Sequence, residues 1–190
     1  MTGEILTVMT SIELVGNALC LDFANTVNAR PVAQRDWLGT AEEARTWAAA
    51  VGYSVTGVIA ETELRGARWL REVVYRVFRP LAHGERPPAT ELDHLIDTYA
   101  GALDQAELQP DANAYRLVWP HRDALDALSA EVAASAVELL THGPLQRVGE
   151  CPTCGWLFLD TSKNGRRRWC SMATCGSRDK ARRYYARHTG

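Results

Sequence analysis

The chain has 190 residues, 46% of them hydrophobic, which is enough for a packed core and excludes a wholly disordered protein. No apolar run approaches the roughly 20 residues that a membrane-spanning helix needs, which excludes an integral helical membrane protein. The net charge of −2 is unevenly spread: residues 1–150 carry 12 arginines, no lysine and 21 acidic residues, a net of −9, whereas residues 151–190 carry 9 basic and 2 acidic residues, a net of +7.

The N-terminal segment has no basic stretch followed by an apolar run, so it does not resemble a secretory signal. We therefore expect a cytoplasmic protein, with its thiols reduced. The apolar run from Leu19 to Phe23 fits either a short buried strand or the start of a helix, and its periodicity does not distinguish them. Cys20, within this run, fits a small buried core thiol.

Four polar residues in the same region form a candidate site: Asp22, Asn25, Thr26 and Arg30. On a helix, Asp22, Thr26 and Arg30 would share one face and could form the wall of a small-molecule pocket. The alternative, which we favour, is a hydrogen-bonded helix start packed against the core.

Amphipathic patterns predict four longer helices, at residues 40–51, 61–82, 90–103 and 123–141. Thr40 and Glu43 form a capping-box pattern for the first helix, and Gly52 can end it. Thr90 can cap the third helix. A β-hairpin is expected between the third and fourth helices, with strands at 107–109 and 115–119. Residues 1–145 therefore predict a mostly helical α+β domain with one short hairpin.

Four cysteines in the last forty residues have the spacing of a metal site. Cys151 and Cys154 form a C-x2-C pair, and Cys170 and Cys175 form a C-x4-C pair, with fifteen residues between the two pairs. Four thiolates suit tetrahedral Zn²⁺, and such a site leaves zinc no open position for catalysis. Two disulfides would need an oxidising compartment. An iron site is the other alternative, but only one knuckle of the rubredoxin type is present.

The order of elements predicted for residues 146–190 is that of a treble-clef finger: a knuckle, a β-hairpin and a helix. Gly155 follows the second cysteine, where a glycine lets backbone N–H groups face the thiolates. Asn164-Gly165 predicts a hairpin turn between strands at 156–160 and 166–170. Cys175 opens a helical stretch that reaches about Arg187, with Ser177, Ala181, Tyr184 and His188 as a face that could pack on the hairpin.

Basic side chains cluster on this segment and predict a nucleic-acid interface. The candidates are Lys163, Arg166, Arg167, Arg168, Arg178, Lys180, Arg182, Arg183 and Arg187. Arginine can make bidentate contacts to phosphate or guanine. The alternative is that these arginines pair with the acidic body, which would leave little positive potential for a partner.

Two segments resemble a known family. CPTCGWLFLDTSKNGRRRWCSMATCGSRDKARRYYAR resembles the CGNR zinc finger of bacterial proteins described as stress-induced transcription regulators. LVGNALCLDFANTVNAR resembles the start of the ABATE domain that precedes this finger. The likeness is specific in the finger and looser over 40–120. It implies one zinc ion on the four cysteines and DNA binding by the finger. The family tetrad Cys-Gly-Asn-Arg is Cys175-Gly176-Ser177-Arg178 here.

These observations favour a DNA-binding transcription regulator whose N-terminal domain senses a small-molecule effector or forms a homodimer. An RNA- or ribosome-associated zinc protein is the first alternative. An enzyme with a pocket in the N-terminal domain and a non-catalytic zinc is the second. We do not expect an enzyme, because the sequence contains no nucleophile elbow, phosphate-binding loop or HExxH motif.

Overall fold

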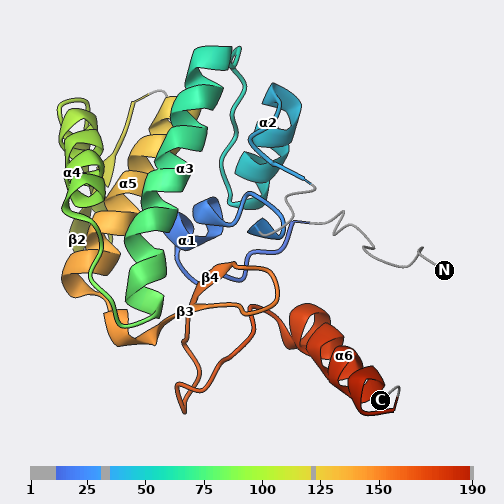
Figure 1. Ribbon diagram of the computed structural model, residues 1–190. Helices are drawn as coiled ribbons and strands as arrows, with labels where there is room; N and C mark the ends of the chain where they lie inside the picture. Colours follow the sequence, from blue (N-terminus) through green and yellow to red (C-terminus); the bar gives the residue numbers. More distant parts are fainter. Residues whose placement is uncertain (1–11, 31–34, 121–122, 189–190) are drawn as a thin grey trace.

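The computed structural model describes residues 12–30, 35–120 and 123–188, and places a layer of helices beside a small zinc-finger module (Figure 1). The helices are α1 (Leu19–Ala24), α2 (Ala41–Ala50), α3 (Glu61–Ala82), α4 (Ala89–Leu103), α5 (Leu125–His142) and α6 (Ser177–His188). The strands form two antiparallel pairs, β1 (Glu107–Asp111) with β2 (Ala114–Val118), and β3 (Val148–Glu150) with β4 (Leu157–Leu159).

The long helix α3 lies at the centre of the body, and α1, α4 and α5 pack against it (Figure 1). Its apolar stripe, which includes Val73, Val77 and Phe78, is fully buried, as are Leu128 and Val132 of α5. The spacing of three and four residues between these side chains aligns them on one side of each helix. The predicted core stripes of the second and fourth helices are therefore confirmed.

Three local predictions can be compared with the structure. The sequence left open whether the apolar run from Leu19 to Phe23 is a strand or the start of a helix, and the structure shows a helix over residues 19–24. Thr40 caps α2 as expected, because its hydroxyl accepts a hydrogen bond from the Glu43 amide at 3.2 Å. Thr90 does not cap α4, since the helix begins one residue earlier and its N-cap is Pro88, whose ring already holds φ near −61°.

The hairpin between α4 and α5 is confirmed, but its first strand is two residues longer than predicted, and its second strand begins and ends one residue earlier. Pro110 pairs with Tyr115, so only Ala112 and Asn113 form the turn. None of the helices in the described ranges is both long and apolar enough to cross a membrane.

Candidate metal centre and nucleic-acid interface

The zinc knuckle is built by a tight turn between β3 and β4. The Cys151 amide donates to the Trp156 carbonyl at 2.8 Å, and the Gly155 amide donates to the Cys151 carbonyl at 2.9 Å. Gly155 has φ +74°, a left-handed conformation that a glycine adopts without strain. This turn brings Cys151 and Cys154 to the same side of the hairpin.

The hairpin of the finger differs from the predicted one. β4 pairs with β3, which precedes the knuckle, and residues 166–170 form no strand. The other edge of β4 is already bonded by the N-terminal segment: the Leu159 amide donates to the Gly16 carbonyl at 2.8 Å, and the Asn17 side chain donates to the Leu159 carbonyl at 2.8 Å. No edge of β4 remains for a strand at 166–170, so Asn164-Gly165 turns a loop and not a hairpin.

All four predicted zinc ligands converge. Cys151, Cys154, Cys170 and Cys175 are buried, and their Sγ atoms lie within 4.8 Å of one another. The Cys154 and Cys170 sulfurs are 3.5 Å apart, close to the roughly 3.8 Å edge of a tetrahedron with Zn–S bonds near 2.3 Å. None of the cysteines forms a disulfide. The donor set fits one structural zinc ion, closed to further ligands by four thiolates.

The electrostatics of the cluster favour metal binding. Hydrogen bonds among the four closely spaced sulfurs lower the pKa of Cys151 and Cys175 and raise the pKa of Cys154 and Cys170, because the sulfurs compete for the same protons. Holding all four as thiolates therefore needs the positive charge of a metal ion. Cys20 lies outside the cluster, fully buried on α1, and burial raises its pKa to about 12. It is a core thiol, as predicted.

Both acidic residues of 151–190, Asp160 and Asp179, are buried, and sequence reasoning missed their role. The Asp160 carboxylate accepts hydrogen bonds from the amides of Ser162 at 2.9 Å and Arg167 at 2.8 Å, which fixes the basic loop. Asp179 lies 2.9 Å from Arg182 and 3.1 Å from Arg183. The available signal was that these are the only two carboxylates in a strongly basic segment.

Arg167 corrects the predicted DNA interface, because its side chain faces into the finger. Its guanidinium donates to the Val15 carbonyl at 2.7 Å, to the Trp169 carbonyl at 3.1 Å and to the Cys170 carbonyl, and it stacks on Phe158 at 4.3 Å. A group with these partners joins the finger to the N-terminal segment and has little capacity left for phosphate.

The other basic candidates with described side chains are exposed: Lys163, Arg166, Arg168, Arg178, Lys180, Arg182 and Arg183. Arg166 and Arg168 line a surface cavity of about 430 Å³ together with Trp169 and Met172. Arg187 belongs to α6, but its side chain lies outside the described part of the chain. The structure thus gathers two groups of cations, one on the loop at 161–168 and one on α6.

Helix α6 extends away from the helical body (Figure 1). The face predicted to pack on the hairpin is exposed, and Tyr184 stacks on His188 at 4.2 Å within the helix. The helix is anchored at its first turn, where Asp179 is buried and the Ser177 hydroxyl donates to the Met172 carbonyl at 3.1 Å. Ser177, at the asparagine position of the tetrad, therefore bonds a neighbour in the turn that carries Cys175.

The polar residues near the N-terminus do not converge on a pocket. Asp22 accepts from the Gly16 amide at 2.7 Å, and the Thr26 hydroxyl donates to the Phe23 carbonyl at 2.9 Å. The Asn25 amide accepts from the Leu157 N–H at 2.9 Å and donates to the Leu157 carbonyl at 2.8 Å. These groups are buried and hydrogen-bonded against the core, as the favoured alternative expected, but they do not form a helix start, because Asn25 is the C-cap of α1 and Thr26 follows it. Asn25 is the member of this group that binds the finger.

Arg30 also joins the two parts of the chain. Its amide donates to the Cys154 carbonyl at 3.1 Å, and its guanidinium stacks on Tyr75 at 3.6 Å and binds Glu72 at 2.8 Å. Arg30 also lines a shallow cavity together with Glu150 and Gly155, on the side of the knuckle that faces α3.

Asp22 gives a testable pH dependence. Burial raises its pKa from 3.8 to about 6, so the folded protein holds this proton more tightly than the unfolded chain does. Folding stability from this group is therefore present at low pH and is lost as the pH rises through 6. Relative to Asp22→Asn, we expect the free energy of unfolding of the native protein to fall by about 1 to 1.5 kcal/mol between pH 5 and pH 7.

Urea denaturation of both proteins at each pH measures this difference, and subtraction removes the contribution of every other titrating group. A difference that stays constant between pH 5 and pH 7 would show that Asp22 keeps an ordinary pKa.

Comparison with known proteins identifies both parts of the chain. The ABATE family model, described as "Putative stress-induced transcription regulator", matches residues 17–143. The CGNR zinc finger model matches residues 147–188. No curated protein matches the chain.

Proposed function

Because the chain belongs to the ABATE family and ends in a CGNR zinc finger, we propose that it regulates transcription by binding double-stranded DNA through that finger. The observation that carries the proposal is the projecting basic helix. Four cations with described side chains lie on α6, which stands clear of the acidic body.

The charge arrangement supports a polyanionic partner. The two carboxylates of residues 151–190, Asp160 and Asp179, are buried within the finger, where Asp179 pairs with Arg182 and Arg183. Glu13 of the N-terminal segment interacts with Arg178. These three carboxylates are fewer than the basic residues of the segment. The exposed surface of the finger therefore carries an excess of positive charge, which attracts phosphate. This argues against the alternative that the basic segment is neutralised by the body.

The shape of the finger supports duplex DNA. A twelve-residue helix is about 18 Å long, and the major groove of B-DNA is wide enough to admit it. The loop cations would then reach the adjacent phosphate backbone of the DNA; they are Lys163, Arg166 and Arg168. A single finger buries a modest surface, so we propose that tight binding requires a homodimer on two half-sites about one helical turn apart.

The zinc ion has a structural role in this proposal. Its four thiolates leave no position for water or substrate, so we propose a regulator and not a zinc enzyme. The metal holds the loop at 160–170 and the start of α6 in fixed relative positions, which is what a rigid interface needs.

The test is fluorescence anisotropy of the zinc-loaded full chain with duplex DNA at several salt concentrations. If about five cations reach phosphates, the logarithm of the binding constant should fall against the logarithm of salt with a slope of about −4 to −5. Lys180→Ala should make the slope less steep by about one and weaken binding to all sequences alike. Arg65→Ala, an exposed position on α3, is the matched control and should change neither quantity.

Arginines that read bases should behave differently from the lysine. Arg178→Ala or Arg182→Ala would then relax the preference for one base position. Absence of binding at low salt would refute the proposal. A structured RNA that outcompetes duplex DNA at matched salt would instead support the RNA-associated alternative.

A further inference from the structure

A cavity of about 490 Å³ opens between α4 and α5, beside the end of β2. Its walls are made of small residues, Gly101 and Ala102 on α4 and Ala127 and Ala130 on α5. Larger side chains at these positions would fill the space between two packed helices, so the cavity follows directly from the sequence. Its volume lies in the range of small-molecule sites.

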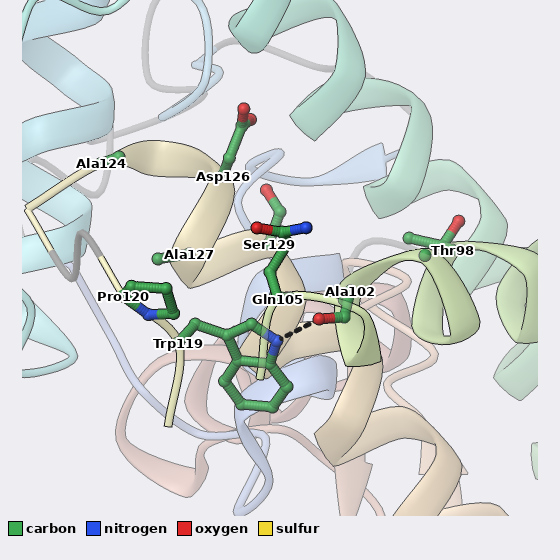
Figure 2. Close-up of a pocket in the computed structure, with 11 residues that line it drawn as sticks. Thr98, Ala102, Gln105, Trp119, Pro120, Ala124, Asp126, Ala127 and Ser129 are labelled. Carbon is green, nitrogen blue, oxygen red and sulfur yellow. Dashed lines mark hydrogen bonds between the residues drawn. The ribbon is translucent and has the colours of Figure 1, made fainter. Parts of the chain in front are cut away.

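The flat wall of the cavity is the indole of Trp119. Its Nε1 donates to the Ala102 carbonyl at 2.8 Å, as Figure 2 shows, and the side chain is only 5% exposed. This bond fixes the ring against the C-terminal end of α4. Little of this residue is open to the cavity, so Trp119 contributes a rigid apolar part of the wall and not an open stacking face.

The cavity also has a polar rim at a distance from the indole. In Figure 2 Asp126 lies at the end opposite Trp119, Ser129 and Gln105 lie between them, and Thr98 lies to one side. Asp126 is the charged side chain among the lining residues, and no basic group of the described part bonds it. Asp126 is exposed at this rim, and partial burial, and then the neighbouring Glu63, raise its pKa, so a cation placed there would meet two neighbouring carboxylates.

We propose that this cavity binds a small organic cation with an apolar body, its amino group at Asp126 and its body against the small residues of α4 and α5 and the edge of Trp119. An apolar cavity with few polar groups and one charged group is the usual composition of a ligand site. Such a ligand would be an effector of the body, and its binding does not depend on DNA binding by the finger.

The zinc-loaded full chain can be titrated with phenethylamine and with its neutral counterpart, 2-phenylethanol, while the Trp119 indole N–H signal is followed by NMR. We expect the amine to bind about three- to fivefold more tightly than the alcohol, the effect of one partly exposed ion pair. Asp126→Asn should remove this preference and leave the affinity for the alcohol unchanged.

A substitution that fills the cavity tests whether the two probes bind there. A Cβ atom at Gly101 meets nothing within 4 Å, so Gly101→Leu should extend into open space, fold normally and weaken both probes at least about fivefold. Gly66→Leu on α3 is the matched control, because that position is also open and lines no part of this cavity. The proposal is overturned if the alcohol binds as tightly as the amine, or if Gly101→Leu leaves both affinities unchanged.

Discussion

Cys151→Ser should lose the zinc ion and also destabilise the helical body. Metal binding is coupled to folding in modules of this kind, with apparent zinc binding energies of about 10 to 16 kcal/mol in isolated fingers. Here the finger shares its core with the body: Val148 of β3 and Leu157 of β4 are buried in the same cluster as the helices. Disorder of the knuckle between them should therefore reach α1 and α3.

We expect elemental analysis to find about one zinc per chain in the native protein and almost none in Cys151→Ser. The thermal midpoint followed at the helical circular dichroism signal should fall by more than about 10 °C, since the strands that complete the core lose their anchor. Chelation of the native protein should give the same result. Cys20→Ala is the control, because it removes a thiol outside the cluster and should leave the metal content unchanged.

Iron in place of zinc, or a full metal content in Cys151→Ser, would contradict the zinc assignment. An unchanged melting transition in metal-depleted protein would contradict the shared core and would show that the body folds independently of the finger.

Asn25→Ala should be the most damaging substitution among the candidate residues that do not bind metal. The Asn25 amide satisfies both the N–H and the carbonyl of Leu157, and all three groups are buried. Alanine would leave both backbone groups without partners, at a cost of about 1 to 3 kcal/mol each. We expect a total loss of about 3 to 5 kcal/mol of folding free energy, measured by urea denaturation of the zinc-loaded protein.

Asn17→Gly provides the comparison. Asn17 also bonds β4, but it is exposed and its φ of +58° suits glycine. Loss of the Asn17 side chain should lower the folding free energy by less than about 1 kcal/mol. Equal effects of the two substitutions would mean that the buried pairing of Asn25 contributes nothing beyond an ordinary surface bond.

Local sequence patterns predicted the parts of the structure that depend on local physics. The apolar stripe of 61–82 fixes α3, whose bounds match the prediction, and the cysteine spacing fixes the metal ligands. The hairpin turn at Ala112 and Asn113 was also recognisable, although the first strand extends to include Pro110.

The sequence predictions that were wrong concern contacts between residues far apart in the chain. Asn164-Gly165 carries a good turn signal, but the edge of β4 was already bonded by Gly16, Asn17 and Asn25, more than 130 residues away in the chain. Arg167 belongs to a run of three arginines, and only the positions of Val15 and Phe158 show that it faces inward. For the cluster from Asp22 to Arg30 the sequence favoured a structural role over a ligand pocket, but its partners in the finger could not be identified from the sequence.

The bonds between Asn25 and Leu157 also bear on the order of events during synthesis of the chain. The side chain that pairs with β4 emerges from the ribosome 132 residues before Leu157 of that strand. Joining residues so far apart carries the entropy cost of closing a long loop and cannot precede translation of the finger. Until β4 has been synthesised, the Asn25 amide at the C-terminal end of α1 lacks its native partner, so we expect the body to reach its final packing only after the finger has been made.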